Sequence, residues 1–502
     1  MKKRPFHLKT RMNFPKIYNG KNAVAIIDYR SDMTGAVSEK NYQSGNYESN
    51  QTFTEREALA LRFRSTLIKR WDNSDKTSFH FVYRNNKMDQ IPSYRIRQNR
   101  NQGQLTGTGS GEINSNAFRS YMGMIQHKID FNFSKSSLIF GTTVDFSPQD
   151  YMAEKLDVIV DTNTGKNLDY AIRNGDYLLY YQTDILNYAG FAQYEISPIH
   201  SFKITGAIRY DGFQYNYDNL IEATAGVSDT QVSYKNWSPK IGFNYSFTNY
   251  LGIYGSYANG FTPPQVSSLF RNSNNNNVGD VIFDLKPAKF NNFEIGGYYS
   301  IPTKLHVDLA LYQLDGRNRL VSMRDDAGNF VQKNAGKTRS LGIELGTTYN
   351  LTKNLSIAYN GSFASHKYIS FYDNNIDYSD TRMEIAPKYL ANITMQYKPL
   401  QNLFLALELE QVGEYNTSFE GQAIVGQNSN GEDTFGTATY GGYNILNFRA
   451  NYTFKSIELW MQMLNINNTL YAVRASYSKW SKENTYSIGN PRAFHFGVKY
   501  NL

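Results

Sequence analysis

The stretch SLGIELGTTYNLTKNLSIAYNGSFAS, residues 340–365, contains two runs of alternating apolar and polar residues around a short turn. Side chains alternate between the two faces of a β-strand, so each run has one apolar face and one face of small or polar residues. The first run places Leu341, Ile343 and Leu345 on its apolar face. This pattern suits a soluble sheet that covers a protein core, and it also suits a membrane barrel that turns its apolar face to lipid.

The same hairpin pattern repeats along the whole chain. Short polar connections between alternating runs occur at 72–76, 134–137, 197–201, 248–249, 302–304, 351–354, 399–402 and 455–456. Long segments rich in Asn, Gly, Ser, Tyr and charge separate these hairpins, at about 84–117, 147–187, 213–235, 259–289, 315–336, 366–386, 413–442 and 474–490. Alternation of short turns and long loops is typical of outer-membrane barrels, whose turns face the periplasm and whose loops face outside.

Eight hairpins supply sixteen strands, and the runs Ala23–Arg30 and Arg492–Asn501 bring the number to eighteen. Residues 6–14, with apolar residues in phase, would be a nineteenth. Open sheet edges are not tolerated in lipid, so such a meander has to close on itself or on further strands. We therefore predict an all-β fold, an antiparallel transmembrane β-barrel of the outer membrane whose terminal strand pairs with the strand within 459–470. A large soluble β-protein is the alternative.

Composition excludes several other classes of protein. The 502 residues include 40 Tyr and 31 Phe but no Cys, and the net charge of +8 is spread along the chain. The mean hydropathy is −0.55 and no apolar run approaches the length of a membrane helix. A helical membrane protein, a disulfide framework and a thiolate nucleophile are excluded. The dispersed charge disfavours a nucleic-acid partner and leaves anionic ligands or lipids.

Five segments, in order over roughly residues 180–502, resemble the barrel of TonB-dependent outer-membrane receptors, particularly those for ferric siderophores. They are WSPKIGFNYSFTNYLGIYGSYANGFTPPQVSSLF (237–270), LKPAKFNNFEIGGYY (285–299), NAGKTRSLGIELG (334–346), LNINNTLYA (464–472) and GNPRAFHFGVKYNL (489–502). Two positions depart from the family pattern: Ala288 stands where Glu is usual, and Leu502 where the terminal residue is usually aromatic.

The resemblance implies a barrel of 22 strands around a plugged lumen, of which 18 or 19 are visible here. It implies that residues 1–502 form one TonB-dependent receptor β-barrel domain that is N-terminally incomplete, without signal peptide, plug or TonB-contacting box. We expect that this chain alone is not an energised transporter. The implied location is the outer membrane of a Gram-negative bacterium, with lipid and lipopolysaccharide as neighbours and a monomeric state.

The function implied by the resemblance is import of a ferric siderophore, energised by the TonB system through a plug. Cobalamin, haem, an oligosaccharide or a peptide are alternative ligands. A passive sugar porin of eighteen strands is another reading, and it requires a complete closed barrel; a remnant of a split gene is a third. We expect no enzyme activity and no cofactor, because no catalytic motif is present. We expect no metal site, since the NSNNNN run at 272–277 lacks carboxylates at ligand spacing.

Candidate binding residues cluster in the basic segment 83–104. We predict that an anionic, partly aromatic ligand binds there through guanidinium groups and a phenol, and that the histidine at the mouth of the 366–386 loop also contributes. These candidates are Arg84, Tyr94, Arg95, Arg97, Arg100 and His366. Ligand-binding side chains have to converge over the lumen, whereas side chains that bind lipopolysaccharide point outward. Lys337 and Arg339 share the parity of Leu341, so we expect them on the outer wall, in contact with lipopolysaccharide phosphates.

Overall fold

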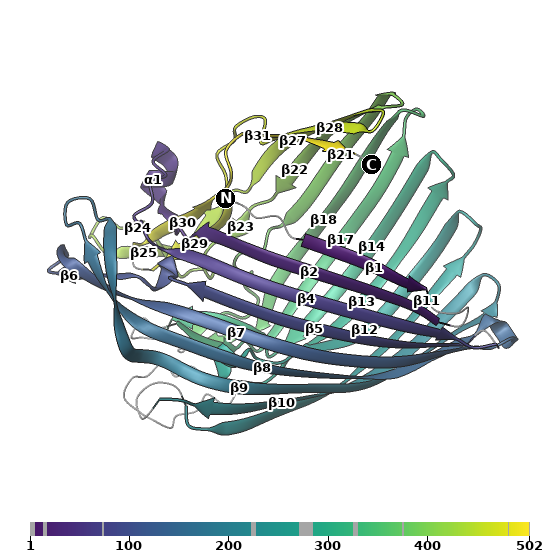
Figure 1. The fold of residues 1–502 in the computed structure, drawn as a ribbon. Helices are drawn as coiled ribbons and strands as arrows, with labels where there is room; N and C mark the ends of the chain where they lie inside the picture. The colour runs from purple at the N-terminus through teal and green to yellow at the C-terminus, as the bar shows by residue number, and fades with distance from the viewer. Residues whose placement is uncertain are drawn as a thin grey trace.

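The computed structural model describes residues 6–13, 18–72, 75–221, 227–270, 285–324, 330–373, 376–479 and 481–500. Nineteen strands of this described part form one antiparallel meander in which each strand bonds to its neighbours in sequence order (Figure 1). They are β1 (Phe6–Asn13), β2 (Tyr18–Asp32), β4 (Glu55–Arg70), β5 (Lys76–Gln90), β7 (Gln104–Asp130), β8 (Ser137–Val160), β9 (Asn167–Ile199), β10 (Phe202–Asn219), β11 (Thr230–Ser246), β12 (Leu251–Thr262), β13 (Ala288–Ile301), β14 (Leu305–Arg317), β17 (Lys337–Asn350), β18 (Leu355–Ser370), β21 (Tyr389–Leu400), β22 (Leu403–Val412), β27 (Tyr443–Phe454), β28 (Ile457–Leu464) and β31 (Ala493–Tyr500).

The remaining elements lie almost entirely at one end of this wall, on the left of Figure 1, which we call the long-loop end. They are β3 (Val37–Ser38), α1 (Glu39–Ser44), η1 (Ser93–Arg95), β6 (Arg97–Asn101), α2 (Val266–Phe270), β15 (Leu320–Arg324), β16 (Phe330–Asn334), β19 (Tyr372–Asp373), β20 (Ile376–Asp377), β23 (Tyr415–Asn416), β24 (Ala423–Gln427), β25 (Asp433–Gly436), β26 (Thr439–Tyr440), β29 (Ala472–Ser478) and β30 (Glu483–Ile488). At the short-turn end, the described residues form one such element, η2 (Phe133–Lys135). Within the described ranges, no helix combines the length and the apolar character needed to cross a membrane.

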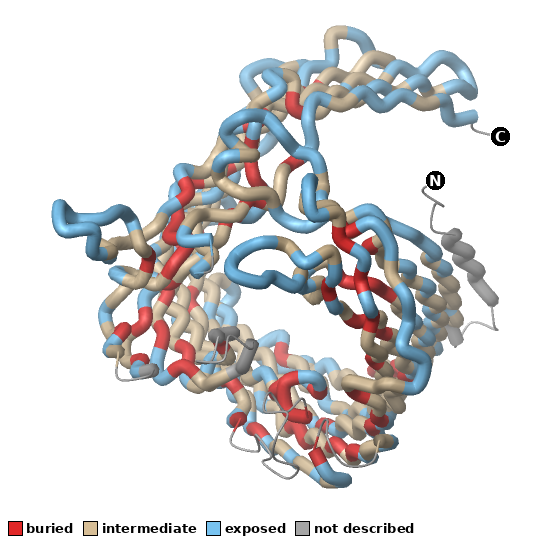
Figure 2. Tube along the Cα trace, turned by 90° about the vertical axis from the view of Figure 1, so that its left-hand side faces the viewer, coloured by how far each residue is buried: buried red, intermediate tan, exposed pale blue. Residues whose placement is uncertain are grey.

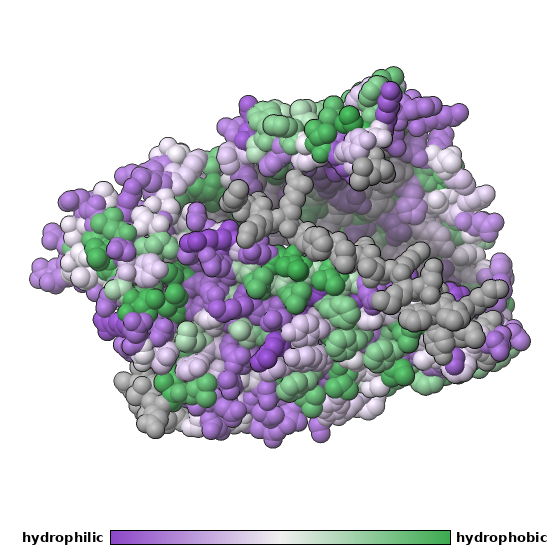
Figure 3. All heavy atoms as spheres, in the orientation of Figure 1, coloured by the Kyte–Doolittle hydropathy of each residue, from purple (hydrophilic) through white to green (hydrophobic). Residues whose placement is uncertain are grey.

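The wall curves into a ring that stays open on one side. β31 pairs with β28, from Ile457↔Tyr500 to Leu464↔Ala493, which confirms the predicted partner of the terminal strand. β1 pairs with β2, and no described residue of β1 bonds to β31. Figure 2 shows the ring interrupted between the two termini, and Figure 3 shows the hollow interior through this opening. The closed ladder of a complete eighteen-strand porin is not seen in the described residues.

The two faces of the wall are sorted as predicted. On β17, Leu341 is 48 % exposed and Ile343 39 % exposed, and both point away from the lumen. Glu344, which alternates with them, lines the lumen together with Ser362 of β18. Exposed Leu, Ile and Phe side chains on every second position would be unfavourable in water and suit a lipid surface.

For two segments, 84–117 and 147–187, the prediction of a long loop is wrong over most of the segment. β7, β8 and β9 have 27, 24 and 33 residues and continue as a hydrogen-bonded ladder through much of 84–117 and 147–187. A strand of about ten residues crosses the bilayer, so the remainder projects beyond it. In β8, Leu156, Val158 and Val160 keep the alternation and are buried in a cluster with Ile91. In β9, residues 171–175 are exposed on both faces, and the apolar alternation that marks a strand is absent there. Ladder hydrogen bonds need no side-chain pattern.

A contact between the first and last loops bridges the open side at the long-loop end. Val37 of β3 pairs with Tyr486 of β30, and the ring of Tyr42 stacks on that of Tyr486 with centroids 4.0 Å apart. The Tyr486 hydroxyl donates to the carboxylate of Glu39, and burial together with this carboxylate raises the pKa of Tyr486 well above its ordinary value. We call these four residues the loop clasp. It links the two ends of the meander at a place where no pairing between wall strands is seen in the described residues.

The sorting of faces makes a prediction for the middle of β17. Leu345→Lys places a charge on the lipid-facing side, where a cation near the bilayer centre costs about 2–4 kcal/mol. We expect a lower fraction of folded, heat-modifiable barrel in phospholipid bilayers and a lower urea midpoint. Ser362→Lys is the control, because it puts the same charge on the lumen face opposite Glu344. Equal destabilisation by the two substitutions would contradict the assignment of the faces.

Candidate functional site

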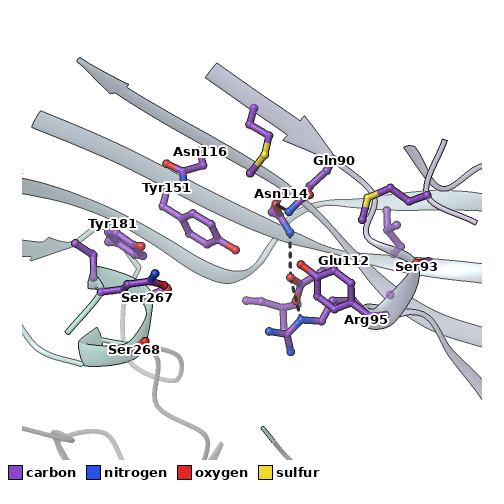
Figure 4. Close-up of a pocket in the computed structure, with 18 of the residues that line it drawn as sticks. Gln90, Ser93, Arg95, Glu112, Asn114, Asn116, Tyr151, Tyr181, Ser267 and Ser268 are labelled. Carbon is purple, nitrogen blue, oxygen red and sulfur yellow. Dashed lines mark hydrogen bonds and ion pairs between the residues drawn. The ribbon is translucent and has the colours of Figure 1, made fainter. Parts of the chain in front are cut away.

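A cavity of about 1630 Å³ lies inside the long-loop end of the wall. Its lining comes from η1 and β6, from the projecting parts of β7, β8 and β9, from the segment 262–268 around the start of α2, and from β29 and β30. The long strands matter here, because a rigid ladder carries their polar side chains beyond the membrane-spanning part of the wall. Figure 4 shows the labelled side chains that surround the cavity.

One side of the cavity is a chain of hydrogen-bonded polar groups. The Gln90 amide donates to Asn114 Oδ1 over 2.9 Å, and the Asn114 amide donates to Glu112 Oε1 over 3.1 Å. The same carboxylate oxygen lies 3.6 Å from Arg95 Nε, as the dashed lines in Figure 4 mark. The Glu112 side chain is only 5 % exposed, so its charge is almost fully committed to these partners. Arg95 is thereby fixed at the cavity surface.

The opposite side is aromatic. Tyr151 stacks on the buried Tyr181 with centroids 5.2 Å apart, and Tyr181 in turn packs against Tyr217. The Tyr215 hydroxyl donates to the carbonyl of Pro264 over 3.3 Å and ties the segment before α2 to the wall. Burial raises the pKa of Tyr215 well above its ordinary value, so this hydroxyl stays a donor at physiological pH. The cavity therefore presents flat aromatic surface next to fixed hydrogen-bond donors.

The cations at the cavity divide into paired and unpaired groups. Lys155 Nζ lies 2.7 Å from Asp176 Oδ1, and Arg173 binds Asp157 over 2.6 Å. Arg97 and Arg474 are exposed and have no ion-pair partner among the described residues. The aromatic ring of Tyr94, which is 60 % exposed, has the Arg95 guanidinium 5.8 Å from its centroid. An anion that enters this cavity meets two guanidinium groups whose charge is not already neutralised.

The structure brings together three of the six predicted binding residues. Tyr94, Arg95 and Arg97 line the cavity, and their binding role stays a prediction. The other three do not line it. Arg84 bonds to Asp145 over 2.7 Å, Arg100 donates to the carbonyl of Gly103 at the β6–β7 hairpin tip, and His366 bonds to Ser340 over 2.8 Å. Ligand contact by these three residues also remains a prediction.

Sequence reasoning missed Arg474, Glu112 and the Gln90–Asn114 pair. Arg474 lies on β29, far along the chain, and no local motif marks it. Glu112 stands in a polar segment of β7 that resembles a loop, and only the ladder shows that it faces inward. The one available signal is that Glu112 is the sole acidic residue between Asp89 and Asp130, a stretch that contains four arginines.

A second cavity of about 620 Å³ lies against the lumen face of β13, β14, β17 and β22. Its charged lining is acidic, with Glu294, Asp308, Glu344 and Glu410. The Tyr254 hydroxyl donates to Asp308 over 3.0 Å. This part of the lumen repels anions, so an anionic ligand is favoured only at the long-loop end. Among the described residues, no group of three or more His, Asp or Glu side chains is placed to hold a metal ion.

Comparison with known proteins agrees with this architecture. The family model described as "TonB dependent receptor-like, beta-barrel" matches residues 9–472. The chain belongs to the TonB-dependent receptor family. Barrels of this family lie in the outer membrane of Gram-negative bacteria, so the long-loop end of this receptor barrel faces outside and the short-turn end faces the periplasm.

Individual relatives are distant and longer. An uncharacterized TonB-dependent receptor of Haemophilus influenzae is 26 % identical over 202 residues, which cover 39 % of this chain and 53 % of the relative. The catecholate siderophore receptor Fiu of Escherichia coli K12 is 23 % identical over 337 residues, which cover 62 % of this chain and 41 % of that receptor. The receptor barrel thus spans about half the length of these relatives or less.

Solved structures share the fold over 99 % of this chain. The ferric citrate transporter FecA has a TM-score of 0.75 at 16 % identity, with 69 % of its chain covered. The ferric yersiniabactin uptake receptor FyuA from Yersinia pestis has a TM-score of 0.73 at 12 % identity, with 70 % covered.

The polar chain in the receptor's cavity makes a prediction about stability. Glu112→Ala removes the acceptor of Asn114 and the counter-ion of Arg95, so we expect a loss of about 1–3 kcal/mol in the free energy of unfolding. Asp157→Ala is the matched control: it breaks a neighbouring pair whose side chains are 53 % and 52 % exposed, which is worth at most about 1 kcal/mol. Urea unfolding measures both. A cost for Glu112→Ala no larger than that of the control would contradict the described network.

Proposed function

We propose that residues 1–502 form the membrane-spanning and ligand-binding barrel of a receptor that imports an anionic ferric siderophore. The supporting observation is the cavity at the external end, which is lined by the ring of Tyr151 and by Arg97 and Arg474, two cations that form no ion pair with any described residue. The names of the relatives and structural neighbours also support a ferric siderophore, because they include proteins for a catecholate siderophore, ferric citrate and ferric yersiniabactin. Cobalamin, haem, oligosaccharides and peptides are the alternative ligands.

The chemistry of the cavity suits a bulky ferric chelate. A planar guanidinium forms paired hydrogen bonds to carboxylate or catecholate oxygens and stacks on aromatic rings. Arg97 and Arg474 would supply these bonds, while Tyr94 and Tyr151 would pack against the organic part of the ligand. The field of the cavity also attracts anions over about 8–10 Å at physiological salt. Recognition at this site requires no bond-making step, and we propose that the receptor is not an enzyme.

Import would be energised from the periplasmic side. We propose that the TonB system acts through a plug domain seated in the polar lumen, that residues 1–502 supply only the barrel, and that the receptor is a monomer. We propose no nucleic-acid partner. The acidic lumen wall around Glu294 and Glu344 supports passage of the ligand along the opposite side of the lumen.

Deletion of the coding sequence in the native bacterium tests this function. We expect uptake of radiolabelled iron as a ferric tris-catecholate to fall in iron-limited cells, and deletion of the TonB system to produce the same loss. Uptake that is unchanged in the first strain for tris-catecholate, hydroxamate and citrate chelates alike would overturn the siderophore assignment.

Charge reversal tests the site. The double substitution Arg97→Glu with Arg474→Glu removes two charge-assisted bonds, each worth about 1.5–3 kcal/mol, so we expect affinity for ferric tris-catecholate to fall at least about a hundredfold. The loss should be larger at low salt than at high salt. Fluorescence quenching on the purified receptor measures both.

The matched control is Lys40→Glu with Lys479→Glu. These two exposed residues lie on α1 and directly after β29, at the long-loop end but outside the cavity. The control changes net charge equally and should leave affinity within about twofold. Equal weakening by both pairs would show that only overall charge matters, and unchanged affinity after the cavity reversal would exclude the site.

A further inference from the structure

The outward residues of neighbouring strands line up in layers on the outer wall. Strand pairing places Lys289 of β13 opposite Arg317 of β14, and Arg317 opposite Lys337 of β17. One outward step closer to the membrane, pairing aligns Asp315 with Arg339, and Arg339 with Lys367 of β18. We name Lys289, Arg317, Lys337, Arg339 and Lys367 the basic rim.

The basic rim carries more positive charge than its surroundings neutralise. Arg339 forms two bonds to Asp315, with Nε 2.7 Å from Oδ1. The other four rim cations are exposed and form no ion pair within the described part of the chain. Like charges directly opposite each other on adjacent strands destabilise a sheet, so an alignment of Lys289, Arg317 and Lys337 calls for an external anion.

An amide and aromatic layer begins beside the second row of the rim, because strand pairing places Asn291 level with Asp315 and Arg339. Asn291 of β13 accepts hydrogen bonds from the Tyr257 hydroxyl over 3.0 Å and from the Asn259 amide over 2.9 Å. The Tyr257 ring packs against Phe293 with centroids 5.0 Å apart. Such a layer of amides on aromatic rings suits the polar–apolar boundary of a membrane.

Below this layer, the lipid-facing surface is hollowed into an apolar groove of about 680 Å³. Gly255 of β12 contributes no side chain to it, and the Phe243 ring leans over this glycine, 2.6 Å from where a β-carbon would stand. The groove is also lined by Tyr257, Phe293, Ile295, Leu311 and Leu341. Its upper edge at Leu341 lies four residues from Lys337, about 13 Å along the strand.

We propose that this surface binds one phosphorylated, multiply acylated glycolipid of the outer leaflet, the lipid A part of lipopolysaccharide. The phosphates lie on the basic rim through charge-assisted bonds, the sugars lie over the amide layer, and one acyl chain occupies the groove. The site is separate from the import cavity, which lies inside the wall. It extends the outward placement of Lys337 and Arg339 to a complete headgroup-and-chain site.

Charge complementarity decides between lipid classes. Lipid A carries two phosphates on a rigid disaccharide, and the row of three cations spans three strands spaced about 4.8 Å apart. Phosphatidylglycerol carries a single phosphate, which one or two cations can bind without the whole row. Loss of one phosphate should therefore weaken binding, which a purely apolar site would not show.

Native mass spectrometry of the receptor, extracted from outer membranes in mild detergent, tests the proposal with bis-phosphorylated lipid A as probe. We expect about one bound molecule per barrel. The triple substitution Lys289→Ala, Arg317→Ala and Lys337→Ala should lower affinity at least tenfold, and the wild type should bind monophosphoryl lipid A and phosphatidylglycerol more weakly.

The control removes a row of three aligned cations on the lumen face at the periplasmic end, where Arg70 pairs with Lys76, and Lys76 with Lys128. Arg70→Ala, Lys76→Ala and Lys128→Ala together should leave lipid A binding unchanged. Ile295→Trp fills the groove without altering charge and should also weaken lipid A binding. This second variant tests the proposal even if the triple substitution in the rim prevents folding. Any of three results would overturn the proposal. The rim variant could bind lipid A as tightly as the wild type, the control could lose as much lipid A binding as the rim variant, or the wild type could bind phosphatidylglycerol as tightly as lipid A.

Discussion

Backbone hydrogen bonding in lipid is the constraint on which this structure depends. A carbonyl or N–H group left unpaired in the hydrocarbon costs several kcal/mol, so every strand needs a partner on both sides. Seventeen of the nineteen wall strands have two partners within the described chain, and β1 and β31 have one each. The same ladder that satisfies the membrane-spanning part also continues outward in β8 and β9, where it serves as a rigid support for the cavity.

This constraint explains what the sequence reveals and what it conceals. Where one face meets lipid and the other meets the lumen, as at Leu341 and Glu344, apolar alternation marks the strand, and the strand order follows from the turns. Where both faces meet water, as in the outer half of β9, the alternation is absent and strand resembles loop. The arginine-rich segment identified one part of the cavity lining, since Tyr94, Arg95 and Arg97 are close in sequence. Arg474 could not be found this way, because it reaches the cavity only through the fold.

Charge is distributed according to the medium that each surface meets. Within the outer part of the wall, cations such as Lys155 and Arg173 lie beside carboxylates, and their fields largely cancel at a distance. Among the described residues, the cations without an ion-pair partner include Arg97 inside the mouth and, outside it, all the residues of the basic rim except Arg339. The wall separates these two groups, so the receptor can present one set to a soluble anion and the other to the membrane without competition.

The loop clasp has a consequence for how the barrel is assembled. The bond between Glu39 and Tyr486 joins residues 447 positions apart, and closing a flexible loop of that length costs roughly 5 kcal/mol of chain entropy. The intervening strands remove this cost only once they have been laid down in register, because the finished wall delivers both loops to the same edge. The clasp is therefore expected to form only after the strands between its two loops are in place.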